Sequence, residues 1–200
     1  MKRYTIGIDE VGRGALAGPV VVAAALLKAR NMFGGNCGLG RRNMKDSKKL
    51  SSKQREAWFN YFNNSSDIQF ALARVYPRRI ERMNISRAAN LAAERATKRL
   101  MANSKWRTAR SRIFLDGGLF LGNGEQPRSA KTLVKGDDKI PAIAVASIIA
   151  KVTRDRFMVR LAKKYPAYGF DIHKGYGTKA HYRALRKCGP CDAHRKTFLL

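Results

Sequence analysis

The alternation of apolar runs with polar and glycine-rich segments predicts a mixed α/β protein. Short apolar runs bounded by turn residues predict strands, and these cover residues 4–9, 19–27, 68–75, 112–116 and 131–135. Apolar residues spaced three or four apart predict helices, and these cover residues 52–63, 77–103, 141–164 and 180–187. Because strands and helices interleave, we expect a central sheet with helices covering its faces.

The segment between the second strand and the first helix has a different character. Residues 28–49 are basic and rich in glycine, and they carry no hydrophobic period. We predict a loop there. Its Arg30–Arg42 stretch could extend a DNA contact or could simply be disordered. The composition shows no break that would divide the 200 residues into two domains.

The charge balance narrows the class of partner. The chain has 41 Lys and Arg residues against 14 Asp and Glu residues, a formal net charge of +27. With 44% hydrophobic residues it has enough apolar material for a core, which argues against a disordered basic tail. So large a positive charge attracts polyanions. Nucleic acid is therefore the expected partner.

The sequence also predicts a cytoplasmic protein. The longest weakly polar run, residues 15–27, is interrupted by Gly18 and Pro19 and is too short to cross a membrane. Asp9 and Glu10 interrupt any apolar stretch that could make the N-terminus a signal peptide. Three cysteines are too few for a disulfide framework, which fits a reducing compartment.

Four acidic residues follow apolar strands and are candidates for chemistry: Asp9, Glu10, Asp116 and Asp137. The carboxyl ends of strands are where α/β sheets commonly place their ligands. Carboxylates that converge repel one another, and a divalent cation relieves that repulsion. Oxygen ligands without nearby His or Cys favour Mg²⁺ or Mn²⁺ over zinc. Any one of these acids alone could simply form a turn.

Together, the acids and the basic surface suggest metal-assisted hydrolysis of a phosphodiester, with two cations bracing the attacking water and the leaving oxygen. One geometric condition applies. Neighbouring residues on a strand point to opposite faces, so Asp9 and Glu10 can share a site only if the strand ends there. The glycines in Gly12-Arg13-Gly14 make such an ending plausible.

The segment from Gly7 to Gly14, GIDEVGRG, continues into Ala17-Gly18-Pro19-Val20 and resembles the N-terminal signature of ribonuclease HII. Later segments resemble further blocks of that family, in the family's order and over nearly the whole chain: residues 46–51, 84–85, 115–117, 135–137, 146–155 and 173–178.

The resemblance implies one RNase H-like catalytic domain over residues 1–200, with a mixed sheet flanked by helices. A small C-terminal appendage of helix and loop, from about residue 165, would contact the substrate. It further implies an endoribonuclease that cuts the RNA strand of RNA/DNA hybrids and nicks duplex DNA 5′ of an embedded ribonucleotide. The products would carry 5′-phosphates, and the role would be ribonucleotide excision repair. The enzyme would be a monomer that uses two Mg²⁺ or Mn²⁺ ions.

The resemblance also assigns roles to residues. Asp9, Glu10, Asp116 and Asp137 would be the metal ligands and catalytic acids. Asp138, where the family commonly has a small polar residue, leaves open which of the two neighbours faces the metals. Gly118 likewise stands where the family often has Asn.

Six residues would bind substrate by the same resemblance. The backbone of Gly12, Arg13 and Gly14 would contact the 2′-hydroxyl that distinguishes RNA from DNA. Tyr176 would stack on the sugar at the RNA-to-DNA junction, although a tyrosine between glycines can also anchor a loop. Lys48 and Lys49 would bind phosphate, although a lone pair of lysines is usually solvated. Direct substrate contact by Lys151, Thr153 or Arg154 is left open.

The cysteine pair near the C-terminus and the high positive charge each have an alternative interpretation. Cys188-Gly189-Pro190-Cys191 has the spacing of a redox pair, and with His194 it offers three zinc ligands. A closed zinc site normally needs four ligands, and we expect only a turn in a C-terminal loop. A non-catalytic, basic nucleic-acid-binding protein would explain the charge, but clustered acids without a metal would repel the phosphate backbone.

Overall fold

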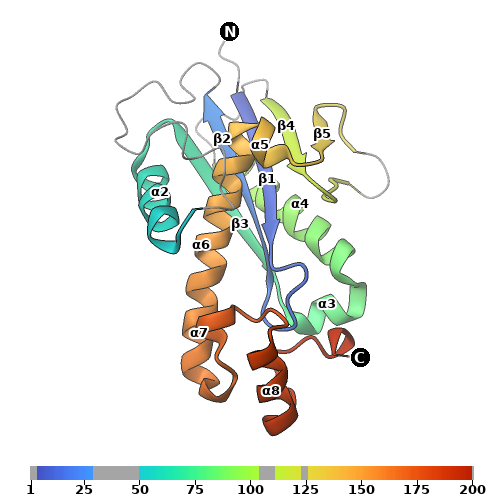
Figure 1. The fold of residues 1–200 in the computed structure, drawn as a ribbon. Coiled ribbons are helices and arrows are strands. Elements are labelled where there is room, and N and C mark those ends of the chain that lie inside the picture. Colours follow the sequence, from blue (N-terminus) through green and yellow to red (C-terminus); the bar gives the residue numbers. More distant parts are fainter. Residues whose placement is uncertain (1–3, 29–49, 104–110, 123–125, 200) are drawn as a thin grey trace.

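The computed structural model describes residues 4–28, 50–103, 111–122 and 126–199 (Figure 1). Five strands form one sheet in the order β3-β2-β1-β4-β5. They are β1 (Tyr4–Val11), β2 (Val20–Lys28), β3 (Ile68–Val75), β4 (Ser111–Asp116) and β5 (Ala130–Leu133). Strands β1 to β3 pair antiparallel, whereas β4 is parallel to both β1 and β5. The predicted mixed α/β sheet is confirmed.

Helices cover both faces of the sheet. They are α2 (Ser52–Asn64), α3 (Pro77–Met83), α4 (Ile85–Asn103), α5 (Gly136–Lys139), α6 (Pro141–Lys164), α7 (Phe170–His173) and α8 (Lys179–Cys188). Two 3₁₀ turns lie at Pro166–Tyr168 and Lys196–Phe198. Strand β2 is buried on both faces: Val22 and Ala24 pack in the cluster with α4, while Ala23 and Ala25 pack in the cluster with α2 and α6. The elements α7 and α8 gather at the end of the molecule where the β1–β2 loop lies (Figure 1).

One predicted helix is two helices. The helix expected over residues 77–103 breaks at Asn84, whose φ is +66°. Asparagine tolerates this left-handed region better than most residues. The Asn84 Oδ1 atom accepts a hydrogen bond from the Arg87 N–H at 3.0 Å, which caps the start of α4. The apolar positions continue across the break, so the hydrophobic period does not reveal it.

Strand β1 is longer than expected. The prediction that it ends at Asp9 and Glu10 is wrong, because Glu10 pairs with Val22 and Val11 with Val21. The parallel pairing of β1 with β4 nevertheless stops at Ile8 and Leu115. Asp9 and Glu10 therefore point to opposite faces of β1, as the alternation requires. They can still border one site without the strand ending, because both lie beyond the last β1–β4 pair and both interact with Asp116 at the end of β4.

Helix α6 lies directly against β1. A Cβ atom on Gly7 would be 2.0 Å from the backbone carbon of Ala142, so only glycine permits this approach. The close packing fixes the register of α6 over the sheet. Ser147 and Arg154, which lie further along α6, are thereby placed near the end of β1.

The Cys188–Cys191 segment is not the pure loop that we expected, because Cys188 is the last residue of α8. Both cysteines are free thiols.

Among residues 4–28, 50–103, 111–122 and 126–199, no helix is long and apolar enough to cross a membrane.

The chain's three histidines gather in this C-terminal region. The His181 Nδ1 atom lies 3.0 Å from the carbonyl oxygen of Tyr176 and must carry a proton to bond it. The His194 Nδ1 atom accepts from the Cys191 N–H at 3.0 Å. The two Nε2 atoms are 3.0 Å apart, so His194 donates there and His181 accepts. Both rings are thus neutral, and an additional proton between them would have no acceptor.

We expect this pair to make the fold acid-sensitive. Burial lowers the pKa of His181 from 6.5 to about 4. Between these values the unfolded chain binds more protons than the folded chain, so stability falls as pH drops from 6.5 to 4. The loss is up to about 3 kcal/mol at about 1.4 kcal/mol per pKa unit. Urea unfolding at pH 7 and pH 4 measures it, and His181→Gln should lose less stability over this range than the wild type. Equal losses in both proteins would contradict the assignment.

Candidate active site

The predicted acids come together at one edge of the sheet. Strands β1, β4 and β5 run parallel, so their carboxyl ends share an edge. Asp9 and Glu10 lie just beyond the last β1–β4 pair, and Asp116 is the final residue of β4. Asp137 lies in α5, which follows β5 directly. The topology therefore brings acids from three separate parts of the sequence to one region.

Asp9 is buried, with 6% of its surface exposed. Its Oδ1 atom accepts a hydrogen bond from the Glu10 N–H at 2.7 Å, and its side chain also bonds Ser147 of α6. Burial raises the pKa of Asp9 well above its ordinary value, and the negative charges of Glu10 and Asp116 raise it further. Asp9 is thus a carboxylate whose charge needs a cation for compensation.

Glu10 lies on the α4 side of the strand. Its Oε1 atom is 3.4 Å from Nη1 of Arg13, whose Nη2 donates to the Ser86 hydroxyl of α4 at 2.8 Å. Burial raises the pKa of Glu10, while Arg13 opposes that rise. The second carboxylate oxygen, Oε2, is buried without a hydrogen-bond partner among the described residues. A buried orphan oxygen of this kind suits a hard cation.

Asp116 is tied to the segment that carries Asp137. The Gly136 N–H donates to Asp116 Oδ1 at 2.6 Å. Gly136 has no room for a side chain, since a Cβ would lie 2.5 Å from Ile143 Cδ1. This bond fixes α5 beside the end of β4. Asp137 is 4% exposed, whereas its neighbour Asp138 is exposed, so Asp137 is the inward-facing member of the pair.

The carboxylates are near one another without forming a finished metal site. Asp9 and Glu10 each feel the charge of Asp116. Within the part of the chain that the structure describes, no three acidic, histidine or cysteine side chains form a ready metal-binding group. The donors are nonetheless all carboxylate oxygens, and one of them is orphaned, so their chemistry fits Mg²⁺ or Mn²⁺.

Residues 12–19 join β1 to β2 and are called the glycine loop here. One of its glycines is closed to a ligand and another is open. Gly12 is buried with φ of +87°, and a Cβ on it would lie 2.1 Å from Arg154 Nε. Gly14 is exposed, and an added Cβ would meet no atom within 4 Å. A ligand could approach the main chain at Gly14 but not at Gly12.

Tyr176 belongs to residues 174–178, which join α7 to α8 and are called the tyrosine loop here. This loop lies beside the glycine loop, although the two are far apart in sequence. The Gly175 carbonyl accepts hydrogen bonds from the N–H groups of Leu16 at 2.8 Å and Ala17 at 3.2 Å. The half-buried Tyr176 ring is 5.2 Å from the guanidinium carbon of Arg154. The glycine loop and the tyrosine loop thus form one surface.

Two buried arginines that hold this surface were not recognised from the sequence. Arg154 and Arg195 are both fully buried. The guanidinium of Arg154 donates to main-chain carbonyls, so the open question of its contact with substrate is answered against direct contact. The His194-Arg195-Lys196-Thr197-Phe198 segment carries no pattern that would indicate this role, because the partners of Arg195 are backbone carbonyls. Lys151 instead pairs with Asp155 at 2.8 Å.

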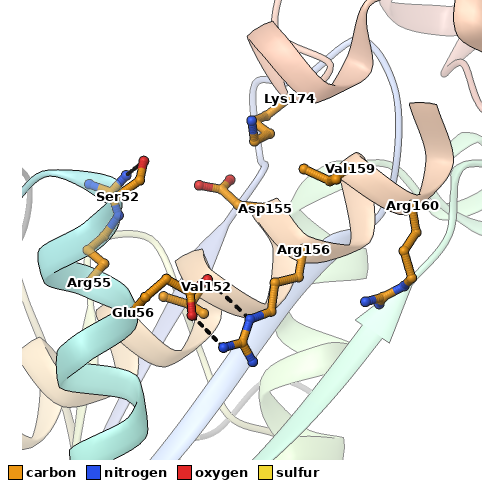
Figure 2. A pocket seen from close by; sticks show the side chains of 9 residues that line it. All are labelled: Ser52, Arg55, Glu56, Val152, Asp155, Arg156, Val159, Arg160 and Lys174. Carbon is orange, nitrogen blue, oxygen red and sulfur yellow. Dashed lines mark hydrogen bonds and ion pairs between the residues drawn. The ribbon is translucent and has the colours of Figure 1, made fainter. Parts of the chain in front are cut away.

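A groove lined by both cations and carboxylates adjoins the tyrosine loop. It lies between α2 and α6 and has a volume of about 390 Å³. Its lining includes Arg55, Arg160 and Lys174 as well as Glu56 and Asp155. Figure 2 shows the Glu56–Arg156 ion pair on one side of the groove and Lys174 on another. Because Lys174 is two residues from Tyr176, the groove continues the surface formed by the two loops. Lys48 and Lys49, and the Arg30–Arg42 stretch, lie outside the described residues.

Comparisons with known proteins agree on one family. The sequence model described as Ribonuclease HII matches residues 6–200. Proteins named Ribonuclease HII from Coxiella burnetii and Caldicellulosiruptor bescii are 42% and 40% identical, covering 96% and 98% of this chain and 86% and 87% of theirs.

Solved structures give the same fold. The ribonuclease H2 of Pyrococcus horikoshii superposes with a TM-score of 0.74 at 25% identity, over 97% of this chain and 93% of that one. A Bst-RNase HIII crystallised in complex with Mn²⁺ superposes with a TM-score of 0.68 at 21% identity, over 98% of this chain and 64% of that one. At that identity the second likeness supports the fold alone.

Proposed function

Because the chain belongs to the ribonuclease HII family, it is an endoribonuclease that acts on RNA/DNA hybrids, and we propose that it also nicks duplex DNA 5′ of an embedded ribonucleotide. The observation that carries the proposal is the group of acids at the carboxyl edge of the sheet, with the orphaned Glu10 Oε2 beside Asp9 and Asp116. A protein that only binds nucleic acid gains nothing from such acids beneath a phosphate backbone.

We assign Asp9, Glu10, Asp116 and Asp137 as ligands for two divalent ions, Mg²⁺ or Mn²⁺. The carboxylates must draw closer to share such ions, and a cation offsets the burial and the repulsion that raise the pKa of Asp9 and Glu10. When bound, the ions would activate water and stabilise the departing oxygen. Water adds to phosphorus, the bond from phosphorus to the 3′-oxygen breaks, and the products are a 3′-hydroxyl and a 5′-phosphate.

The two loops supply recognition in this proposal. The exposed main chain at Gly14, with that of Arg13, contacts the 2′-hydroxyl of the ribonucleotide, while Gly12, which is buried against Arg154, shapes the loop. Tyr176 stacks on the sugar of the junction beside it. Charge attraction brings the duplex to the surface, and the net charge of +27 makes binding salt-dependent. Lys48 and Lys49 are proposed to bind phosphate near the acids.

We propose a single catalytic domain whose C-terminal segment, from about residue 165, meets the substrate, and which acts as a monomer. We place its work, ribonucleotide excision repair, in the cytoplasm.

A test of the junction role compares Tyr176→Ala with Tyr176→Phe. We expect the alanine variant to lose about tenfold in nicking at a single ribonucleotide, because the contact between the ring and the junction sugar would be lost; tenfold corresponds to about 1.4 kcal/mol. Cleavage of a long RNA/DNA hybrid should fall less. The measurement is kcat/KM on both substrates with Mg²⁺ or Mn²⁺. Tyr176→Phe retains the ring and should stay near the wild type.

An equal loss on the two substrates in Tyr176→Ala would refute the junction role. Failure of the wild type to nick a duplex with one ribonucleotide, across several divalent metals, would refute the proposed activity itself.

A further inference from the structure

Arg195 is an unusual residue to find buried. Its surface is 0% exposed, and within the described ranges it forms no ion pair with a carboxylate. Burial, aided by the charge of Arg154, lowers the pKa of Arg195 to about 9, which measures how unfavourable the environment is for a cation. A buried cation without a paired carboxylate needs several hydrogen-bond acceptors to offset the loss of water. The partners of Arg195 therefore show what its place in the fold depends on.

The hydrogen bonds that Arg195 donates all end on the glycine loop. Its Nη2 atom donates to the carbonyls of Gly12 at 2.7 Å and Gly18 at 2.9 Å. Its Nη1 atom donates to the carbonyl of Arg13 at 2.9 Å, and its Nε atom to Gly18 at 3.1 Å. Its backbone N–H donates to Leu16 at 2.8 Å. Arg195, in the C-terminal segment, thus holds both ends of the glycine loop, Gly12 and Gly18.

Arg154 has a different set of partners. It donates to the carbonyls of Ala17 and Pro19, each at 3.0 Å, and also to Lys174 at 2.9 Å. Arg154 therefore joins the glycine loop to the tyrosine loop, whereas the hydrogen bonds of the Arg195 guanidinium all go to the glycine loop. Its other contact is the Phe198 ring, 5.2 Å from the guanidinium carbon, so a change at Arg195 affects the glycine loop without touching the hydrogen bond to the tyrosine loop.

The position of Gly14 depends on these bonds. Gly14 is the exposed point of the loop, and its neighbours Gly12 and Arg13 have carbonyls fixed by Arg195. A planar guanidinium can donate in several directions in one plane, which the single nitrogen of lysine cannot reproduce. Replacement by lysine would keep one donor nitrogen on a side chain of similar length and release part of the loop.

We propose that Arg195 is a positioning residue that sets ribose selectivity, by holding the carbonyls of Gly12, Arg13 and Gly18 so that the main chain at Gly14 meets the 2′-hydroxyl. This inference rests on the proposed function. Arg195 touches no substrate. Its effect is on the discrimination between a ribonucleotide and a deoxyribonucleotide, and not on the general attraction of the protein for duplexes.

The test measures binding with cleavage disabled. Asp116→Asn is the parent, and the dissociation constants for a DNA duplex with one ribonucleotide and for the same all-DNA duplex are compared with Mg²⁺ present. The parent should prefer the ribonucleotide. In Asp116→Asn with Arg195→Lys, we expect this preference to fall by about tenfold, the equivalent of one well-placed hydrogen bond, towards equality. Affinity for all-DNA duplex should not change, because the Arg195 side chain is fully buried and touches no substrate.

Circular dichroism melting checks that the Arg195→Lys variant is folded at the assay temperature. As a second measurement, Arg195→Ala in the same parent is titrated with millimolar guanidinium ion or methylammonium ion. Guanidinium should restore the preference because it can occupy the same three carbonyls, and methylammonium should not.

A preference unchanged in Arg195→Lys, or restored equally by the two ions, would overturn this inference alone. A parent without any preference for the ribonucleotide would overturn the proposed recognition and this inference with it.

Discussion

Replacing Asp116 or Asp9 with asparagine is expected to lower the cleavage rate by about 10³-fold or more while leaving substrate binding largely intact. Each substitution removes one negative charge from the carboxylates proposed to hold the ions, and metal ions contribute several kcal/mol to stabilising the charge that develops during hydrolysis. The assay is single-turnover nicking of a duplex with one ribonucleotide, with affinity measured separately.

These substitutions should not unfold the protein. The Oδ1 atom of Asp116 accepts the Gly136 N–H at 2.6 Å, and the amide oxygen of asparagine can accept the same bond. At Asp9, the Glu10 N–H has the equivalent acceptor, and removing a buried charge relieves repulsion. Lost activity with a native melting temperature would therefore report on chemistry.

Asp138→Asn is the matched control. It removes the same charge from the neighbour of Asp137, but from an exposed side chain. We expect it to change the rate by less than a few-fold. Cleavage by Asp9→Asn or Asp116→Asn at the wild-type rate would end the catalytic assignment.

The second large effect concerns replacement of Gly12 and of Gly14 by alanine. The substitution should destabilise the fold at Gly12 but not at Gly14. Gly12→Ala is expected to lower the free energy of unfolding by about 3 kcal/mol. Alanine at a φ of +87° costs roughly 1–2 kcal/mol, and its Cβ would be forced against Arg154 Nε at 2.1 Å, with about 1–3 kcal/mol more for overpacking. Urea unfolding measures this loss.

Gly14→Ala should leave the free energy of unfolding within about 0.5 kcal/mol of the wild type, because an added Cβ meets nothing and the position is exposed. It should still weaken nicking at a ribonucleotide, since the methyl group would stand where the ribose approaches the main chain. A stable Gly12→Ala variant, or full activity in Gly14→Ala, would contradict this view of the loop.

The elements that the sequence predicts well are those set by local pattern. The apolar runs of β2 and β3 and the helical period of α6 depend on neighbours within a few residues, and the predicted ranges agree with the structure to within one or two positions. The break at Asn84 is also local, but it depends on a single φ angle that the hydrophobic period does not encode.

The acids were identifiable because each follows an apolar strand, and parallel strands bring such residues to one edge. The extension of β1 to Val11 was missed because Glu10 and Val11 pair only with β2. Their pairing is set by the antiparallel register and not by their own composition.

The two buried arginines could not be predicted. A hydrophobic pattern places arginine on the surface, and the partners of Arg154 and Arg195 are backbone carbonyls, which every residue carries. The bonds from Arg195 to the loop span 177 to 183 residues. Only the folded chain reveals that these carbonyls converge.

The most direct test of the account measures Mn²⁺ binding by electron paramagnetic resonance in the wild type, in Asp9→Asn, Asp116→Asn and Asp137→Asn, and in Asp138→Asn. We expect each of the first three variants to bind Mn²⁺ at least about tenfold more weakly, as charge compensation among shared ligands requires, and Asp138→Asn to match the wild type. Unchanged Mn²⁺ affinity in all four variants would show that these carboxylates do not act together on a metal ion.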